Sequence, residues 1–455
     1  MTYVRDTIAA VATPPGFGAV GIVRLSGPQA PEIARTMAGS LPDARQAKFA
    51  RFVDAAGVPI DEGLILYFPA PHSFTGEHVV EFQGHGGPVV MDLLLARCLG
   101  LGARAARPGE FSERAFLNGK LDLTQAEAVA DLIASGSVAA VRAAGASLRG
   151  EFSHRVDSLV EALTELRAYT EAALDFPDEE IDFLSSGDVA GRIADLITRI
   201  DALMATADQG RLLSEGMTVV IAGPPNAGKS SLLNRLAGEE TAIVSDIPGT
   251  TRDVLKTQIL IDGMPVHVVD TAGLRASDDQ IEREGIRRAR SAAASADALL
   301  WVTDDRLDAG DPVDYLAEMA VTIPDGSPML WVRNKIDLTG TPPGPVSGFA
   351  ANRQVLGVSA RSGAGLEVLR QELRSVVGKG GSDAGIFSAR RRHMDALARA
   401  RRHLIAGRRQ LDTAAAGELV AEELKLAQQH LGEITGKVTS DDLLGKIFSS
   451  FCIGK

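Results

Sequence analysis

The hydrophobic residues of this chain change their spacing several times along its length. In residues 1–118, short runs rich in β-branched and aromatic residues stand between glycines and prolines: VGIVRL, GLILYF and HVVEF. Such runs are typical of β-strands. The apolar stretch PVVMDLLLARCLGLG has helical length and ends at glycines, so it predicts a helix. We therefore expect residues 1–118 to form a small α+β domain.

The spacing then becomes helical. From 119 to 213, apolar and charged residues recur every three or four positions, as in RVDSLVEALTELRAYTEAAL, which predicts long helices interrupted near Pro177. From 214 to 378, apolar runs such as TVVIAG, VHVVD and DALLWVT alternate with helical stretches, which predicts a doubly wound parallel sheet. Residues 379–455 begin within the Gly/Ser linker GKGGSDAG and are helical again. The simplest organisation is one discontinuous all-α domain that carries an inserted α/β domain.

The composition narrows the possible classes of protein. The 455 residues are 45% hydrophobic and 23% charged, and no apolar run reaches the ~18 residues that a membrane span needs. The first residues lack the apolar core of a secretory signal, so we expect a cytoplasmic protein. Its two cysteines, Cys98 and Cys452, are too few for a disulfide framework and lack metal-ligand spacing.

The formal net charge of −12 does not favour nucleic acid, so contact with RNA needs a local basic patch. One candidate for a tRNA contact is the stretch from Arg390 to Arg409, which holds eight arginines. The alternative is a solvated face of a helix.

A phosphate-binding loop opens the α/β domain. GPPNAGKS, from Gly223 to Ser230, stands between a predicted strand and a predicted helix, which is the context that supports this motif. Its glycines let backbone N–H groups turn toward phosphate oxygens. Lys229 adds a positive charge at the reacting phosphates, and Ser230 offers its hydroxyl to Mg²⁺. These features predict a P-loop NTPase.

Further motifs predict that the nucleotide is GTP and that the inserted domain is a Ras-like G domain. DTAG, from Asp270, ends the next apolar strand, and SDIPGTTRD supplies Thr251 as a second Mg²⁺ ligand. NKID ends with Asp337, whose carboxylate can accept two hydrogen bonds from guanine, and SAR follows a later strand. The residues expected to bind GTP are Asn226, Ala227, Gly228, Lys229, Ser230, Ser231, Ser245, Asp246, Ile247, Pro248, Gly249, Thr250, Thr251, Asp270, Thr271, Ala272, Gly273, Asn334, Lys335, Asp337, Ser359, Ala360 and Arg361.

The hydrolytic step needs a group other than the common glutamine, because Leu274 follows DTAG. Glu282, on the helix-like segment that follows, is the candidate for orienting water; the alternative is a surface glutamate. Asn226 could help to bind a monovalent cation that stabilises transition-state charge, or it could be a turn residue.

The closing FCIGK, together with VGIVRLSG, VEFQGHGG, FLNGKLDL, DIPGTTRD and DTAGLR, resembles the MnmE (TrmE) family of tRNA-modification GTPases over the whole chain. The resemblance implies action with a flavoprotein, MnmG, on carbon 5 of the wobble uridine (position 34) of certain tRNAs, which receives an aminomethyl or carboxymethylaminomethyl group. It implies a one-carbon unit from 5,10-methylenetetrahydrofolate, of which 5-formyltetrahydrofolate is an analogue. It also implies a homodimer through the folate-binding N-terminal domain, and potassium-dependent GTP hydrolysis.

The resemblance also assigns roles to individual residues. The positions that match the family's folate site are Arg24, Glu81, Lys120 and Lys455. Those that match its metal sites are Ser230 and Thr251 for magnesium, and Asn226, Ser245, Ile247 and Thr250 for potassium. Glu282 matches the water-orienting glutamate. The tail is expected to fold back to the folate site with Cys452, either as a structural contact or as a catalytic nucleophile.

The chain departs from the usual family pattern at Pro248, at Arg361 and at the pair Pro224 and Pro225, none of which removes a required donor or acceptor. Two other functions stay open at this point. One is a regulatory, ribosome-associated GTPase without modification chemistry, which would lack a folate pocket. The other is a folate-dependent transferase whose GTPase is incidental.

Overall fold

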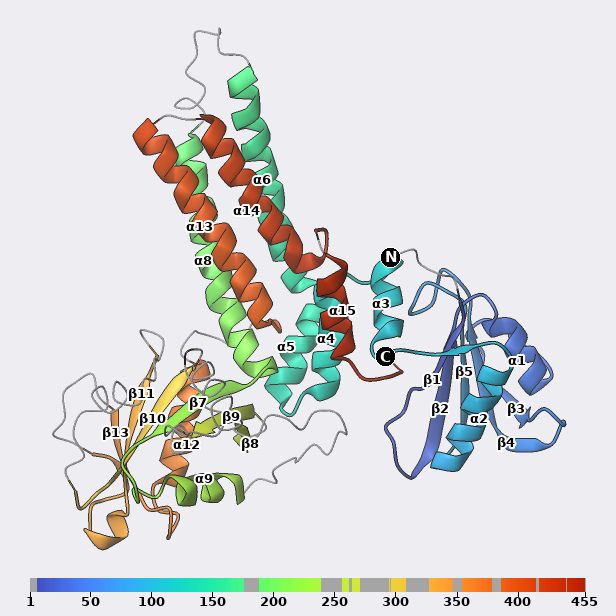
Figure 1. The fold of residues 1–455 in the computed structure, drawn as a ribbon, viewed down its shortest axis with the longest axis horizontal. Helices are drawn as coiled ribbons and strands as arrows, with labels where there is room; N and C mark the ends of the chain where they lie inside the picture. The colour runs from blue at the N-terminus through green and yellow to red at the C-terminus, as the bar shows by residue number, and fades with distance from the viewer. Residues whose placement is uncertain are drawn as a thin grey trace, which may run out of the picture. The chain divides into compact units, whose positions relative to one another are not determined.

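The computed structural model divides into two compact units, which Figure 1 shows as a ribbon. One unit comprises Met1–Ile133, Ser147–Asp201 and Asp395–Lys455; the other comprises Ala134–Ala146 and Ala202–Met394. None of the described helices combines the length and apolarity that a membrane crossing requires. The structure describes residues 6–175, 188–238, 256–261, 264–270, 294, 296–307, 327–346, 354–378, 386–414, 417–438 and 440–454.

The first unit begins with a six-stranded sheet, as far as the described residues show, in the order β3-β4-β5-β2-β1-β6. Neighbouring strands are antiparallel except β1 and β6, which are parallel. The expected strands are confirmed at β2, β4 and β5 and the expected helix at α2, whereas the sequence pattern missed β1, β3 and β6. The elements are β1 (Ile8–Val11), β2 (Gly18–Ser26), α1 (Ala30–Ala38), β3 (Lys48–Val53), β4 (Pro59–Phe68), β5 (Val79–Gly86), α2 (Pro88–Gly100) and β6 (Arg104–Ala105).

Helices α1 and α2 cover one face of this sheet, because every second residue of its central strands is apolar. Val23 and Leu25 of β2, Phe82 of β5 and Leu94 of α2 are fully buried in one core. The residues between them, such as Arg24 and Glu81, therefore point to the opposite face of the sheet. That face is the one that carries the predicted folate-binding side chains.

The rest of the first unit is helical, as the sequence predicts. Figure 1 shows α6 and α14 side by side in a bundle that also contains parts of α8 and α13. An ion pair between Arg399 of α13 and Glu433 of α14 joins two of these helices. The helices are α3 (Glu110–Leu117), α4 (Leu123–Ala134), α5 (Val138–Leu148), α6 (Glu151–Asp175), α8 (Val189–Ser214), α13 (Arg391–Ala414), α14 (Gly417–Thr435) and α15 (Asp441–Ser449). Of these, α4, α5, α8 and α13 contribute residues to both units.

The second unit contains a seven-stranded sheet in its described part, in the order β12-β13-β11-β10-β7-β9-β8. The five central strands are parallel, and β10 is buried along its whole length, as is typical of a sheet covered on both faces. The elements are β7 (Met217–Ala222), α9 (Lys229–Gly238), β8 (Lys256–Ile261), β9 (Met264–Asp270), β10 (Ala298–Asp304), β11 (Met329–Asn334), a 3₁₀ turn (Ile336–Leu338), β12 (Gly344–Pro345), β13 (Gln354–Val358) and α12 (Leu366–Gly378).

The sheet is parallel at its centre, as predicted, and antiparallel at its two edges. Strand β8 pairs antiparallel with β9, and β12 pairs antiparallel with β13. Only two residues separate β8 from β9 in the sequence, and a connection that short can join only antiparallel strands.

Candidate nucleotide and N-terminal sites

The loop between β7 and α9 has a backbone that only particular residues can adopt. Gly223 has φ 149° and Gly228 has φ 92°, in the region that favours glycine. A Cβ on Gly223 would overlap the carbonyl oxygen of Val302, and one on Gly228 would overlap Nδ2 of Asn334. Asn226 also has a positive φ, 63°, which asparagine tolerates better than most residues. The backbone therefore has a left-handed conformation at three positions of this loop, which lets it curve around a phosphate group.

Lys229 is the first residue of α9, and its ammonium group lies inside the loop. Its Nζ donates to the carbonyl oxygens of Gly223 at 2.7 Å and of Pro224 at 3.0 Å. The residue is only 8% exposed. Ser230, the expected magnesium ligand, is exposed on the next position of the helix. The positive charge thus lies at the helix N-terminus, where an anion is favoured.

Asn334 joins the three nucleotide motifs that the structure describes. Its Nδ2 donates to the carbonyl oxygen of Ala227 in the phosphate loop at 2.9 Å. Its Oδ1 accepts from the backbone N–H of Ala360 in the SAR motif at 3.0 Å and from that of Lys335 at 2.9 Å. The residue is 1% exposed. Strands β7, β11 and β13 end at the same edge of the parallel sheet, and this edge is where such folds bind nucleotides.

The carboxylate expected to recognise guanine is also fixed in place. The hydroxyl of Ser359 donates to Oδ1 of Asp337 at 2.6 Å, which links the NKID and SAR motifs. A carboxylate that is held before the base arrives loses little freedom on binding. Arg361 is exposed at the end of the same motif.

Several predicted residues lie outside the described part of the chain, and for Asp270 only the backbone, at the end of β9, is described. Their roles in magnesium, potassium and water binding stay predictions. These residues are Ser245, Asp246, Ile247, Pro248, Gly249, Thr250, Thr251, Thr271, Ala272, Gly273, Glu282 and Lys455.

In the first unit, two of the predicted folate residues lie side by side on the sheet. Arg24 of β2 and Glu81 of β5 are cross-strand partners in the antiparallel register. The Nε and Nη2 atoms of Arg24 both lie 2.9 Å from Oε1 of Glu81. The guanidinium also lies over the ring of Phe111 of α3, 5.9 Å from its centroid. Both charged side chains remain partly exposed, at 25% and 13%, so a ligand could reach them.

The C-terminal tail of the chain contacts the same pair of side chains through Arg24. Nη1 of Arg24 donates to the carbonyl oxygen of Gly454 at 3.4 Å, across 430 positions of sequence. Gly454 has φ 93°, and a Cβ there would overlap the carbonyl oxygen of Val11 and lie 3.0 Å from Cα of Ala12. Only glycine permits both that backbone and that close approach.

Further contacts fix the tail from the side of α15. The backbone N–H of Gly109 donates to the carbonyl oxygen of Cys452 at 3.3 Å. Phe451 packs against Phe448 with ring centroids 5.4 Å apart, in a small core that includes Leu123. The thiol-bearing residue Cys452 is exposed. The tail is thus bound to the N-terminal domain through its backbone, which leaves the cysteine side chain toward solvent.

Lys120, the third described folate candidate, follows α3 and is exposed. Its backbone N–H donates to the carbonyl oxygen of Ala115 at 2.8 Å, and its side chain passes over Gly76. Asn118, two residues earlier, donates to the carbonyl oxygen of Thr75 at 2.7 Å. The segment after α3 is therefore attached to the loop that precedes β5, on which Glu81 lies.

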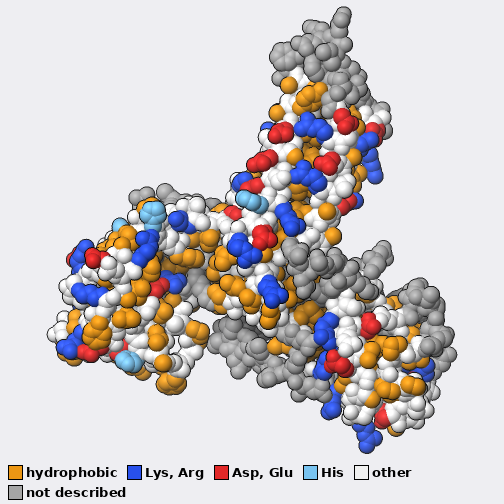
Figure 2. Space-filling model, turned by 180° about the vertical axis from the view of Figure 1, so that it is seen from behind, with side chains coloured by type: hydrophobic (Ala, Val, Ile, Leu, Met, Phe, Trp, Pro, Cys, Tyr) orange, Lys and Arg blue, Asp and Glu red, His pale blue; other side chains and the backbone are white. Residues whose placement is uncertain are grey.

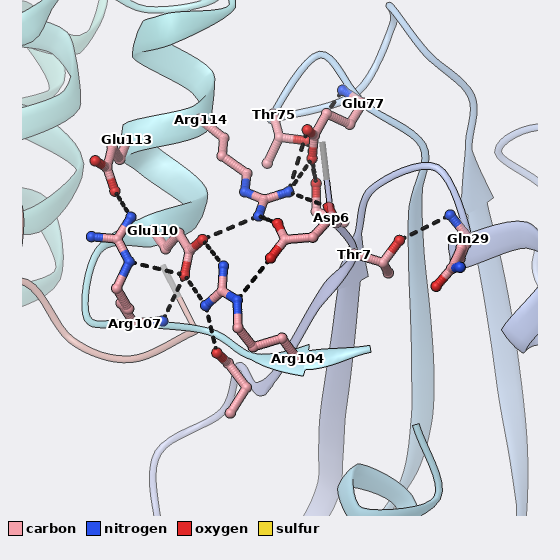
Figure 3. Close-up of polar contacts among 12 residues, drawn as sticks. Asp6, Thr7, Gln29, Thr75, Glu77, Arg104, Arg107, Glu110, Glu113 and Arg114 are labelled. Atoms are coloured by element: carbon pink, nitrogen blue, oxygen red, sulfur yellow. Dashed lines mark hydrogen bonds and ion pairs between the residues drawn. The ribbon is translucent and has the colours of Figure 1, made fainter. Parts of the chain in front are cut away.

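An ion network around the buried side chains of Arg114 and Glu110, which the sequence analysis missed, holds α3 against the sheet (Figure 3). The guanidinium of Arg114 pairs with Asp6 at 2.6 Å, Glu77 at 3.0 Å and Glu110 at 3.1 Å, and Arg104 pairs with Glu110 at 2.6 Å. Burial alone would raise the pKa of Glu110, but hydrogen bonds, first from Arg104, outweigh it and lower that pKa. The network joins the segment before β1, strand β6, α3 and the loop before β5.

The arginines of α13 have acidic neighbours in the bundle. Arg401 pairs with Asp201 of α8 at 2.5 Å, and Arg408 pairs with Asp412 at 3.1 Å. Figure 2 shows basic and acidic side chains interspersed along the bundle on the face that it displays. These ion pairs favour the interpretation of a charged helix face, and a tRNA contact here stays a prediction.

A phosphate loop joined through a buried asparagine to a guanine-recognition motif, on a mainly parallel sheet, defines a P-loop GTP-binding protein. Here that domain is combined with a helical domain and an N-terminal α+β domain. The model of the MnmE helical domain matches residues 123–452, and that of the GTP-binding protein TrmE N-terminus matches residues 7–120. The chain therefore belongs to the MnmE family and is a GTP hydrolase.

Two curated relatives span the full chain. The tRNA modification GTPase MnmE of Alkalilimnicola ehrlichii is 58% identical over 452 residues, which cover 99% of this chain and 100% of the relative. That of Stutzerimonas stutzeri is 58% identical over 458 residues, with 100% of both chains covered. A solved GTP-binding protein from Sulfolobus solfataricus in complex with GDP is 18% identical, with 49% of this chain and 67% of that chain covered and a TM-score of 0.24. A likeness this weak adds nothing to the family assignment.

Proposed function

We propose that this protein modifies the wobble uridine of certain tRNAs and takes the one-carbon unit from a reduced folate bound by its N-terminal domain. The observation that carries the proposal is the meeting of Arg24, Glu81 and the carbonyl oxygen of Gly454 at one place on the N-terminal sheet. A GTPase that only regulates would not need its C-terminal tail to reach a pair of partly exposed charges on its N-terminal domain.

The residues at this place suit the chemistry of a folate. The carboxylate of Glu81 can accept two hydrogen bonds from the amino and ring N–H groups of a pterin. Arg24 and the exposed Lys120 supply cations for an anionic ligand, and Lys455 is one residue beyond the docked Gly454. Bound 5,10-methylenetetrahydrofolate would supply the one-carbon unit. Cys452 is exposed beside this site, either as a contact or as a nucleophile.

The G domain is proposed to hydrolyse GTP with two kinds of metal ion. Ser230 and Thr251 would hold Mg²⁺, and Glu282 would orient the attacking water. Asn226, with its left-handed backbone in the phosphate loop, would contribute to a K⁺ site. The other proposed potassium ligands are Ser245, Ile247 and Thr250.

Partners follow from the family. The substrate is tRNA, and the proposed co-enzyme is the flavoprotein MnmG. A homodimer through the N-terminal domain is proposed from the family resemblance.

Calorimetric titration of the full chain with 5-formyltetrahydrofolate tests the folate proposal. We expect saturable binding that Glu81→Ala abolishes. The control is Glu62→Ala, which removes an exposed carboxylate paired with Arg51 on the same sheet and should leave binding intact. No saturable binding to the unaltered chain would favour the regulatory GTPase instead.

GTP hydrolysis in potassium and in sodium at equal ionic strength tests the cation proposal. We expect a faster rate in potassium, and equal rates would remove the role given to Asn226. If Asp270→Ala left tRNA modification unchanged, the GTPase would be incidental to the transfer.

A further inference from the structure

Asp304, at the end of β10, lies among positive charges although no nucleotide motif includes it. Its side chain is 6% exposed. Its Oδ2 accepts from Nζ of Lys335 at 2.8 Å and from Nη2 of Arg306 at 2.7 Å, and its Oδ1 accepts from Nε of Arg306 at 3.0 Å. The hydrogen bond from Arg306, with help from Lys335 and against the effect of burial, holds the pKa of Asp304 well below its usual range. The carboxylate is therefore charged at neutral pH.

Lys335, the lysine of the NKID motif, connects Asp304 with the phosphate loop. Its Nζ also donates to the carbonyl oxygen of Asn226 at 2.6 Å. Its backbone has φ 69°, and its N–H donates to Oδ1 of Asn334. Both ends of the side chain are thus held, and its aliphatic part spans from the guanine-recognition motif to the phosphate loop.

An ammonium group bound to two acceptors has less freedom than one bound to a single carbonyl oxygen. A flexible lysine would lose side-chain entropy when a ligand orders it. Charge-assisted hydrogen bonds are stronger than neutral ones. The bond from Lys335 to Asp304 therefore orders the lysine before the nucleotide binds, so less side-chain entropy is lost on binding.

We propose that Asp304 is a positioning residue for guanine-nucleotide binding, which acts by fixing Lys335 between the end of β10 and the phosphate loop. It sets how tightly the nucleotide is held and leaves the choice of base to Asp337. Arg306 shares the same carboxylate, but its side chain is 50% exposed and forms no part of the link to the loop.

The test measures dissociation of a fluorescent GDP analogue from the full chain. Asp304→Asn keeps the shape of the side chain and removes its charge, so we expect dissociation to become about 10-fold faster, as for a lost charge-assisted hydrogen bond. The matched control, Arg306→Gln, removes the other cation that pairs with Asp304 and should change the rate by less than about 2-fold.

A double-mutant cycle separates positioning from general structure. In a chain that already carries Lys335→Ala, Asp304→Asn should have no further effect on dissociation. Asp304→Asn should also weaken the binding of GDP and the binding of inosine diphosphate by the same factor, because Asp337 still recognises the base. An unchanged rate in Asp304→Asn, or effects of the two substitutions that simply add, would overturn the proposal.

Discussion

Replacement of Arg114 by methionine should destabilise the N-terminal domain far more than loss of a surface ion pair would. The arginine side chain is 3% exposed and pairs with Asp6, Glu77 and Glu110. Methionine keeps the apolar part of the side chain and removes its charge. Three carboxylates then remain. Arg104 still pairs with Asp6 and Glu110, and Arg107 still pairs with Glu110.

The magnitude follows from burial and from the partners that are left. Removal of one partner of a buried ion pair costs about 3–5 kcal/mol. Arg104 offsets part of this cost, and Glu77 keeps its hydrogen bond from Ser26 at 2.6 Å, so we expect about 3 kcal/mol. The control Arg51→Met breaks a pair with Glu62 whose side chains are 63% and 46% exposed, and should cost at most about 1 kcal/mol.

Native-state hydrogen exchange is the suitable assay, because a chain with several domains does not melt in one step. The opening free energy of amides in β1 and α3 should fall by about 3 kcal/mol in Arg114→Met and by less than about 1 kcal/mol in Arg51→Met. The difference between the two variants should shrink as the pH falls from 7 to 4, because protonated carboxylates carry no charge that needs a partner. Equal losses in the two variants at pH 7 would refute the argument from burial.

Three other predictions concern the unaltered chain and the phosphate loop. The lowered pKa of Glu110 means that its stabilising contribution is complete at neutral pH and is lost as pH falls below the ordinary carboxyl range, so α3 amides should exchange faster at pH 3 than at pH 6, after correction for intrinsic rates. Burial raises the pKa of Cys98 to about 12, while Cys452 is exposed, so a thiol reagent at pH 8 should modify one cysteine in the folded chain and two in denaturant. Gly228→Ala places a Cβ against Nδ2 of Asn334 and should weaken GDP binding by about 10-fold or more in fluorescence titrations, whereas unaltered binding would contradict the close packing seen there.

The nucleotide site was predictable because its signals are local. The eight residues from Gly223 to Ser230 carry their own strand, turn and helix context, and Asn334 belongs to an equally compact motif. The pairing of Arg24 with Glu81 depends instead on the register of two strands whose paired residues are 57 positions apart. No spacing in the sequence encodes that register, so these residues were found only through the family resemblance.

What the sequence analysis missed has physical reasons as well. Strand β1 reads IAAV and β6 has two residues, so neither carries a run of β-branched residues long enough to stand out. Glu110 and Arg114 stand four positions apart on α3, where such a pair usually lies on the exposed face of a helix. Asp304 follows an apolar strand without belonging to any motif, and its role depends on contacts with a lysine 31 positions away.

Binding of 5-formyltetrahydrofolate to Gly454→Ala tests most directly whether the end of the chain completes the N-terminal site. The added Cβ would overlap the carbonyl oxygen of Val11 at a residue with φ 93°. Gly445→Ala in α15 adds a Cβ with nothing within 4 Å and serves as the matched control. We predict that Gly454→Ala weakens folate binding at least about 10-fold with GDP binding unchanged, while Gly445→Ala binds both ligands normally. Equal folate affinity in the two variants and the unaltered chain would contradict the account.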